Sequence, residues 1–313
     1  MSLPRNERGL QREMTEDAPK SIGGGGSDVR WTIGSLIQWA TDDFRARGIE
    51  NPRLDAELIV AFALKTTRMQ LIIDSKRPLE GAELAKLRDL VRRRRAREPV
   101  AYLRGEREFF GLPFRVTSSV LIPRPDTETL VTVGLARTAH LSLALRHLDL
   151  CTGSGCVAIA IARARPTAQV FATDISEDAL VVARENAYRL GAYNVAFRAG
   201  DLFEPVRDLH PKLDLITANP PYIASAEIPS LQPEIKDFEP RVALDGGADG
   251  LDLVRRIVEG APAHLARGGI LAIEIGEGEA SETRALFERS GFADIQTERD
   301  YGKIERVVSG KIA

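Results

Sequence analysis

From about residue 126 onward, apolar residues alternate between short runs of strand type and longer runs with helical spacing. The predicted strands cover residues 147–150, 170–173, 195–198, 213–218, 270–275, 295–298 and 306–309. The predicted helices cover residues 157–164, 178–190, 251–264 and 280–290. Strands and helices in alternation indicate an α/β fold with a doubly wound, mostly parallel sheet.

The end of this pattern departs from the parallel rule. Only the turn around Asp300–Lys303 separates the last two predicted strands, and that is too short for a parallel crossover. We therefore expect an antiparallel hairpin there. A Rossmann-like sheet of seven strands with an antiparallel last strand is the architecture of class I methyltransferases.

Three segments are predicted to precede this α/β domain, which covers residues 123–313. Residues 1–28 are polar and end in a glycine run, so they predict a flexible leader. Residues 29–105 have helical spacing punctuated by prolines, which predicts a small helical bundle domain. Residues 106–122 have short apolar runs broken by Gly111 and Pro113, typical of a hairpin linker.

The helical segment is expected to bury three apolar faces. Their members are Leu36, Ile37, Trp39, Ala40 and Phe44, then Leu54, Leu58, Ile59 and Phe62, and finally Leu84, Leu87 and Val91. The run Arg92–Arg95 lies at the end of the third helix, where cations complement the helix dipole. We interpret this run as a solvated face without a function of its own.

The composition and charge of the chain exclude several classes of binding partner. The formal net charge of -2 gives no overall attraction to nucleic acid or to an anionic membrane, so neither is expected to bind directly. Cys151 and Cys156 are too few for a disulfide framework and lack the flanking ligands of a zinc site. No stretch approaches the roughly 20 apolar residues of a membrane span. We expect a cytoplasmic protein, and nothing in the sequence indicates obligate assembly beyond a monomer.

A glycine-rich loop follows the first predicted strand, in the segment Asp149–Cys156. Glycine lets the backbone approach a ligand closely, and open α/β sheets bind ligands where strands end. On the loop alone, S-adenosylmethionine, a nicotinamide dinucleotide and a simple tight turn all remain open. Asp174 ends the second strand about 20 residues beyond the loop, which places a carboxylate at the distance of the ribose hydroxyls. An ordinary acid at a helix N-terminus is the alternative for Asp174.

The third and fourth strands add to this pattern. Asp201 can accept a hydrogen bond from an adenine amino group while Leu202 packs on the ring. The fourth strand runs into Asn219-Pro220-Pro221-Tyr222, where two prolines hold the backbone rigid. A planar amide or exocyclic amine can donate one N–H to the Asn219 side-chain oxygen and one to the Pro220 carbonyl. These four residues are the predicted reaction site.

Methylation of an amide nitrogen calls for orientation and polarisation rather than for a strong base, a metal or a covalent nucleophile. No metal is therefore expected. The cysteines lie far from the Asn219 loop in sequence, which disfavours carbon methylation through a cysteine. The four histidines are scattered without ligand spacing and are interpreted as surface or packing residues: His140, His147, His210 and His264.

Several motifs together resemble the release factor glutamine methyltransferase family, also called PrmC or HemK. They are Glu98–Tyr102, Arg107–Gly111, Ile122–Glu128, Asn219–Tyr222, Phe238–Pro240 with Ala243–Leu244, and Asp300–Gly302 leading to Glu305–Arg306. The resemblance runs from about residue 31 to the last residue. It implies methyl transfer from S-adenosylmethionine to the glutamine side-chain amide in the Gly-Gly-Gln loop of class I peptide-chain release factors. The second product is S-adenosylhomocysteine.

The resemblance also implies roles for particular residues. The helical domain would dock the release factor, and Asn219–Tyr222 would grip its glutamine. Together with Asp201, the expected cofactor-binding residues are Cys151, Thr152, Gly153, Ser154, Gly155, Asp174, Leu202 and Asn219.

Two residues depart from the family pattern. Cys151 stands where the family usually has glycine, so its side chain crowds the cofactor unless it points into the core, and Leu202 stands where an aromatic residue sometimes covers adenine. Arg124 and Glu128 have either a role near the cofactor or an ion pair between hairpin and helix. Two other functions remain open: a DNA or RNA exocyclic-amine methyltransferase, and a noncatalytic partner protein that keeps the fold.

Overall fold

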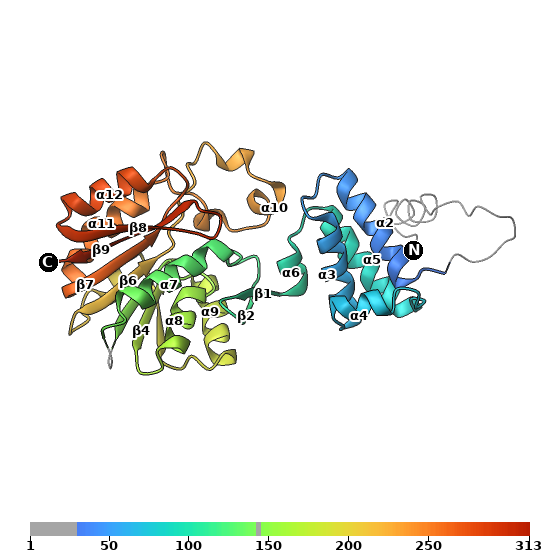
Figure 1. Ribbon diagram of the computed structural model, residues 1–313, viewed down its shortest axis with the longest axis horizontal. Coiled ribbons are helices and arrows are strands. Elements are labelled where there is room, and N and C mark those ends of the chain that lie inside the picture. The colour runs from blue at the N-terminus through green and yellow to red at the C-terminus, as the bar shows by residue number, and fades with distance from the viewer. Residues whose placement is uncertain (1–29, 142–144) are drawn as a thin grey trace, which may run out of the picture.

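The computed structural model describes residues 30–141 and 145–313, which form a helical domain and an α/β domain side by side (Figure 1). The predicted leader, residues 1–28, lies outside the described residues. The helical domain consists of α2 (Ile33–Ala46), α3 (Pro52–Leu64), α4 (Arg68–Ile73), α5 (Gly81–Arg95) and α6 (Val100–Arg104). The predicted hairpin follows as β1 (Glu106–Phe109) and β2 (Leu112–Arg115), an antiparallel pair.

The helical domain has its own core. Thr32 caps α2 through a reciprocal capping box with Ser35, which satisfies backbone donors at the helix start. The predicted faces of α2 and α5 are confirmed, although Trp39 and Leu84 are only partly buried. The predicted face of α3 is partly wrong, because Leu54 is 39% exposed while Ala56, Ile59, Val60 and Ala63 are buried. The α3 helix carries apolar residues on most of its sides, so the sequence pattern alone does not determine which side is buried. The buried side is the one that includes the small alanines.

The interpretation of Arg92–Arg95 as a solvated face is wrong for Arg94. Its side chain is only 5% exposed and forms ion pairs with Asp55 at 2.8 Å and Glu234 at 2.7 Å. Glu234 also pairs with Arg97, 2.7 Å away. Because Glu234 belongs to α10 (Pro233–Lys236) of the α/β domain, these pairs join the two domains. The partners lie 39 and 140 residues from Arg94, so local sequence gave no sign of them.

The α/β domain contains the predicted seven-stranded sheet. Its strands are β3 (Arg146–Leu150), β4 (Gln169–Asp174), β5 (Val195–Ala199), β6 (Leu213–Ala218), β7 (Leu265–Glu274), β8 (Phe292–Arg299) and β9 (Glu305–Ile312). The order across the sheet is β5-β4-β3-β6-β7-β9-β8, and β9 runs antiparallel to both of its neighbours. The expected fold class and the reversed last strand are confirmed.

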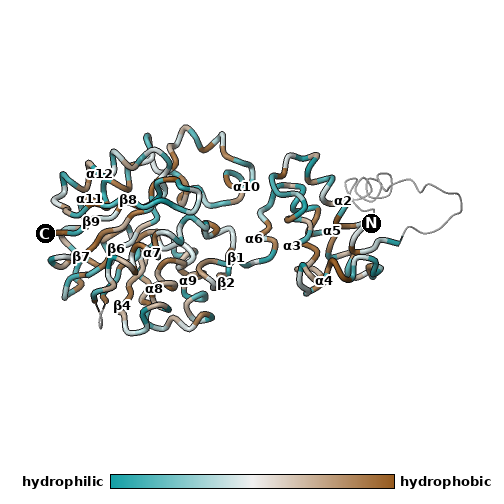
Figure 2. Tube along the Cα trace, viewed as in Figure 1, coloured by the Kyte–Doolittle hydropathy of each residue, from teal (hydrophilic) through white to brown (hydrophobic). Residues whose placement is uncertain are grey.

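Helices cover both faces of the sheet. The longer ones are α7 (Glu128–Arg137), α8 (Cys156–Ala164), α9 (Glu177–Arg189), α11 (Asp252–His264) and α12 (Ala280–Arg289). One buried cluster joins α7 and α8 to the sheet, and another joins α11 and α12 to its other face (Figure 1). Figure 2 shows hydrophobic residues along β7, an interior strand of the sheet, whose last residues are buried on both faces. Sequence reasoning missed α7, which follows the short 3-10 helix η1 (Pro125–Thr127).

Candidate functional site

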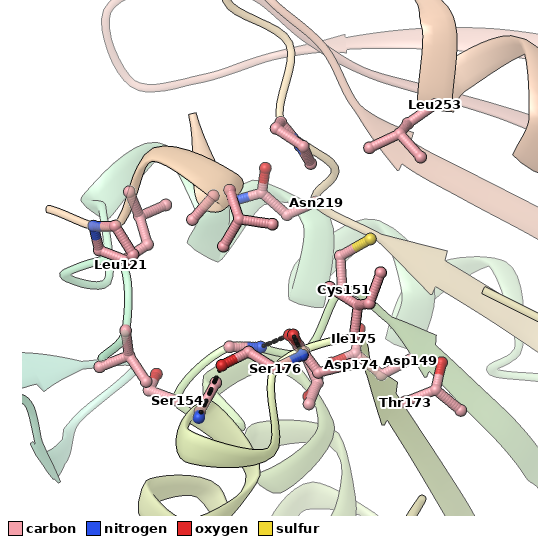
Figure 3. Close-up of a pocket in the computed structure, with 18 of the residues that line it drawn as sticks. Leu121, Asp149, Cys151, Ser154, Thr173, Asp174, Ile175, Ser176, Asn219 and Leu253 are labelled. Atoms are coloured by element: carbon pink, nitrogen blue, oxygen red, sulfur yellow. Dashed lines mark hydrogen bonds between the residues drawn. The ribbon is translucent and has the colours of Figure 1, made fainter. Parts of the chain in front are cut away.

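A pocket of about 520 Å³ lies at the carboxyl ends of β3, β4 and β6, where the strand order reverses (Figure 3). This volume suits a small-molecule ligand. Eight of the nine expected cofactor residues line it: Cys151, Thr152, Gly153, Ser154, Asp174, Asp201, Leu202 and Asn219. Gly155 is the ninth, and it lies outside the lining.

The two loop glycines differ in what surrounds them. A Cβ atom on Gly153 would meet no atom within 4 Å, so this part of the backbone faces open space beside the pocket. A Cβ atom on Gly155 would lie 2.9 Å from Ile159 Cδ1 and 3.2 Å from Ala183 Cβ. Both glycines have positive φ angles, which glycine adopts without steric cost. Gly153 therefore leaves room for a ligand, and Gly155 leaves room for α8 and α9.

Beneath the loop lies a buried polar network that sequence reasoning did not assign. The Asp149 carboxylate accepts hydrogen bonds from Thr152 Oγ1 at 2.6 Å and Thr217 Oγ1 at 2.7 Å. Burial raises the pKa of Asp149 to about 6, although these bonds oppose the shift. His147 Nε2 lies 2.7 Å from Thr217 Oγ1, and burial lowers the His147 pKa to about 3, so the ring is neutral at pH 7. The network fixes the base of the loop.

Asp174 is held in place from two sides. Its Oδ2 accepts a hydrogen bond from the Gly153 amide at 2.8 Å, and its Oδ1 accepts one from the Ser176 amide at 2.9 Å (Figure 3). Ser176 is itself the cap of α9, since its hydroxyl accepts from the Ala179 amide. Asp174 therefore differs from an ordinary helix-capping acid. Burial raises its pKa, and each carboxylate oxygen keeps a further lone pair for a ligand.

Asp201 and Leu202 follow β5 at the same edge of the sheet. Asp201 Oδ2 forms an ion pair with Arg256 of α11 at 2.5 Å, and both side chains line the pocket. Arg256 was missed by sequence reasoning, because 55 residues separate it from Asp201. Leu202 has a φ angle of 46° and is 7% exposed, with its carbonyl accepting a hydrogen bond from Thr173 Oγ1.

Cys151 lines the pocket and also packs against the hydrophobic core (Figure 3). Its φ angle of 55° lies in the left-handed region, where most side chains are strained. Burial raises the pKa of Cys151 and raises that of Cys156 to about 12, so both side chains remain thiols at pH 7.

The Asn219 loop places two of its four predicted residues at the pocket. Asn219 and Pro221 line it, while Pro220 is buried beside them. Asn219 Nδ2 donates a hydrogen bond to Thr127 Oγ1 at 3.1 Å. No described residue donates a hydrogen bond to Asn219 Oδ1. Tyr222 lies outside the lining, and its hydroxyl is 3.4 Å from Oε1 of the buried Glu274.

Of the two interpretations left open for Arg124 and Glu128, the ion pair between hairpin and helix is not formed by these two side chains. Arg124 pairs instead with the buried Glu239 at 2.5 Å, and Glu239 also accepts a hydrogen bond from the Ile122 amide. Glu128 accepts a hydrogen bond from the Phe110 amide at 2.8 Å in the β1–β2 turn. Glu128 thus ties the hairpin to α7 through the backbone, and Arg124 lines the pocket.

Comparisons with known proteins find matches for both the helical domain and the α/β domain. A family described as "PrmC N-terminal domain" matches residues 35–105, and one described as "Methyltransferase domain" matches residues 141–290. A release factor glutamine methyltransferase of Geobacter sulfurreducens is 46% identical, with 90% of this chain and 97% of that protein covered. A protein of the same name from Bordetella pertussis is 44% identical over 83% of this chain and 94% of its own length.

Among solved structures, the hMettl16 catalytic domain in complex with an RNA hairpin has a TM-score of 0.53 at 14% identity, covering 65% of this chain and 77% of that one. At that identity the likeness extends to the fold alone. Within residues 30–141 and 145–313, no helix has the length and apolar character needed to cross a membrane. The same ranges hold no group of three or more His, Cys, Asp or Glu side chains placed to bind a metal ion.

Proposed function

Because the chain belongs to the release factor glutamine methyltransferase family, we propose that it methylates the glutamine side-chain amide in the Gly-Gly-Gln motif of class I release factors, with S-adenosylmethionine as donor and S-adenosylhomocysteine as second product. When bound, S-adenosylmethionine supplies an electrophilic methyl group on a sulfonium centre. No metal is needed for this reaction, since the donor already carries the positive charge.

The pocket residues fit such a donor. The open space beside Gly153 accepts a ligand close to the backbone, and Asp174 offers free lone pairs next to it. Asp201, Arg256 and Leu202 also line the pocket, and Asp201 and Arg256 form an ion pair there. We propose that Asp174 accepts from ribose hydroxyls, while Asp201 and Leu202 hold adenine. Cys151, Thr152 and Ser154 complete the wall, and Gly155 acts by allowing α8 to pack.

The observation that carries the proposal is the orientation of Asn219. Its amide nitrogen is engaged by Thr127, so its oxygen is left to accept a hydrogen bond at the pocket. A glutamine amide has two N–H donors, and we propose that Asn219 Oδ1 accepts one and the Pro220 carbonyl the other. Pro221 would support the amide plane. Held in this way, the amide nitrogen presents one face to the donor, and orientation of this kind contributes roughly 7–11 kcal/mol in favourable cases.

We further propose that the domain of residues 29–105 docks the release factor, while residues 123–313 carry out the chemistry and residues 106–122 join them. The ion pairs of Arg94 and Arg97 with Glu234 support this division. Glu234 lies in the segment after the Asn219 loop, so the docking domain and the reaction site are connected through one short stretch of chain.

Methyl transfer from labelled S-adenosylmethionine to purified release factor tests the proposal. We expect label on the native factor and none on a factor whose Gly-Gly-Gln glutamine is replaced by alanine. Asn219→Ala should lower kcat by about 100- to 1000-fold, the usual cost of removing one oriented polar group at a reaction centre. Binding of S-adenosylmethionine, measured by calorimetry, should persist in that variant.

Duplex DNA and RNA serve as parallel acceptors. Label on nucleic acid but not on release factor would replace the proposed substrate with an exocyclic amine. If S-adenosylmethionine binds without any transfer, the chain is a noncatalytic partner of the release factor. Either result would overturn the proposal while leaving the fold assignment intact.

A further inference from the structure

The backbone that follows the reaction loop Asn219–Tyr222 runs beside a later segment of the chain, Leu244–Gly247, which we call the clamp. The Ile223 amide donates a hydrogen bond to the Leu244 carbonyl at 3.1 Å, and the Gly246 amide donates one to the Ile223 carbonyl at 2.8 Å. These bonds form a short parallel bridge. The chain therefore returns to the end of its own reaction loop, and the function proposed above gives the returning residues no role.

Gly246 brings the clamp against the reaction loop at a distance that only glycine permits. A Cβ atom on Gly246 would lie 2.8 Å from the Pro221 carbonyl oxygen and 2.8 Å from Tyr222 Cα. It would also lie 2.6 Å from the Gly250 carbonyl oxygen. The φ angle of Gly246 is not in the left-handed region, so a side chain is excluded by lack of space and not by backbone strain. All three contacts are with backbone atoms, which cannot turn aside as the end of a flexible side chain can.

The rigidity of the reaction loop gives this contact a consequence for the reaction. Pro220 and Pro221 fix two successive φ angles and restrict the residue before each, so a displacement of Pro221 is passed along the backbone. Its neighbours are Asn219 and Pro220, the residues proposed to accept the two N–H groups of the glutamine amide. A displacement of about 1 Å at a reacting group lowers a rate by about 100-fold. The position of Gly246 therefore affects the reaction centre without contact with substrate.

Asp245 joins the clamp to the residues that follow the reaction loop. Its Oδ1 accepts hydrogen bonds from Ser225 Oγ at 2.5 Å and from the Gly247 amide at 3.2 Å, and its Oδ2 accepts two from the Arg241 guanidinium at 3.1 and 3.0 Å. The hydrogen bond from Ser225, with those from Arg241 and Gly247, lowers the pKa of Asp245, so the carboxylate is ionised at pH 7. The Ser225 amide also donates to the Gly247 carbonyl at 2.8 Å. Ser225 is thus bonded to the clamp through its side chain and its backbone.

We propose that the clamp positions the reaction loop for methyl transfer, with Gly246 and Ser225 setting where Asn219 and the Pro220 carbonyl meet the substrate amide. This inference rests on the function proposed above. Gly246 and Ser225 lie outside the pocket lining, so neither is assigned a contact with substrate or donor. They are positioning residues, and their effect passes through the backbone of the reaction loop.

Gly246→Ala tests the close contact. Because the added Cβ atom must displace backbone, we expect kcat on release factor to fall by about 100-fold. The KM for release factor and the dissociation constant of S-adenosylmethionine should each change less than about threefold, since the lost interaction belongs to the transition state. Native kcat in the folded variant would overturn the proposal.

Gly269→Ala is the matched control. Gly269 is buried in β7, and its added Cβ atom would lie 2.9 Å from the Ala266 carbonyl oxygen and 3.0 Å from that of Leu213. Leu213 is the first residue of β6, whereas the pocket lies at the carboxyl ends of the strands. We expect a lower free energy of unfolding but native kcat. An equal loss of kcat in Gly246→Ala and Gly269→Ala would indicate a general loosening of the fold and would contradict the positioning role.

Ser225→Ala is a milder variant that removes only the hydroxyl group. Asp245 then loses one hydrogen bond, and we expect kcat to fall by about 10-fold, the scale of one hydrogen bond to a charged group. Ser225→Thr keeps the hydroxyl group and should restore native kcat. If Gly246→Ala does not fold, this pair decides, and native kcat in Ser225→Ala or no recovery in Ser225→Thr would rule the proposal out.

A measurement on the free protein separates this inference from the proposed function. The ¹⁵N signal of the Asn219 side-chain amide should shift in Gly246→Ala and keep its native position in Gly269→Ala. An unshifted signal in Gly246→Ala would overturn the positioning role even if release factor is the methylated protein. Absence of transfer from the native protein to release factor would instead overturn the proposed function, and the Asn219 signal would still decide this inference.

Discussion

At the scale of single residues, neighbouring groups occupy some of the hydrogen-bonding positions of the polar side chains in the pocket and so determine which positions remain for a ligand. Asp174 receives two backbone amides and Asn219 donates to Thr127, so each has a fixed direction before any ligand arrives. Such preorganisation lowers the ordering cost of binding and of the reaction. The residues that fix these directions are as necessary as the residues that touch ligands.

Asp174→Asn tests this view at the cofactor. An asparagine keeps one oxygen, but its amide group places donors against either the Gly153 or the Ser176 amide, which are both donors. We expect S-adenosylmethionine to bind at least 10-fold more weakly, since one hydrogen bond to a charged group is worth about 1.5–3 kcal/mol. Calorimetry measures this directly. Equal affinity in the variant would show that Asp174 makes no contact with the ribose.

The sequence alone identified residues that line the pocket better than it identified the residues that contact and orient them. Glycines, strand-end acids and the Asn219 tetrapeptide follow local patterns, and most of them line the pocket. Arg256 and Glu274 do not, because their partners Asp201 and Tyr222 lie 55 and 52 residues away. Contacts of that kind depend on the folded sheet. Of the two alternatives for Arg124 and Glu128, the ion pair is wrong for the same reason, since Arg124 meets Glu239 only after the chain folds.

At the scale of elements, β3, the loop that follows it and α8 form one structural unit. The loop must turn sharply after β3, leave space for a ligand at Gly153, and let α8 begin at Gly155. The strand and helix bounds of this unit were predicted to within a residue, because its apolar pattern is strong. The α7 helix was missed, since its start follows Pro125 and its polar first turn resembles a loop.

Substitution of each loop glycine by alanine distinguishes the role of Gly153 in ligand binding from the role of Gly155 in helix packing. Gly155→Ala should lower the free energy of unfolding by about 1–3 kcal/mol, because its Cβ would press against Ile159 and Ala183. Gly153→Ala should cost about 1 kcal/mol from its left-handed backbone and chiefly weaken S-adenosylmethionine binding. Chemical denaturation and calorimetry on both variants measure the difference. The assignment fails if Gly153→Ala binds the donor as tightly as the native protein.

At the scale of the whole molecule, charge is divided between the two domains. Residues 30–105 contain 16 Lys and Arg against 10 Asp and Glu, whereas residues 106–313 contain 23 against 30. The small overall charge is therefore the sum of a basic helical domain and an acidic remainder of the chain, which contains the hairpin and the α/β domain. Arg94 and Arg97 form ion pairs with Glu234 where the two domains are in contact. In these pairs the cations come from the basic domain and the carboxylate comes from the acidic remainder.

Arg94→Met should weaken the junction between the domains. It leaves Asp55, whose pKa burial already raises, without its cation, and removal of one partner from a buried pair costs about 3–5 kcal/mol. We expect a lower midpoint of thermal unfolding and a higher KM for release factor, with S-adenosylmethionine affinity unchanged. Arg92→Met is the matched control: the Arg92 side chain is 57% exposed and pairs with Asp89 alone among the residues that the structure describes. Its replacement should change stability by less than about 0.5 kcal/mol. Similar effects of the two variants would contradict a special role for Arg94.

The position of β9 between β7 and β8 also constrains how the sheet of the α/β domain can be completed. β8 is hydrogen-bonded to the sheet only through β9, and β9 covers the edge that β7 would otherwise expose. A growing polypeptide that has reached residue 300 thus leaves unpaired the edges of β7 and β8 that β9 later joins, and such edges readily pair with other chains. Both edges close together when residues 305–312 arrive. The same strand carries Arg306, whose guanidinium donates a hydrogen bond to the Ile275 carbonyl and lies 3.8 Å from the Asp126 carboxylate, so β9 also links the end of β7 to η1 beside the pocket.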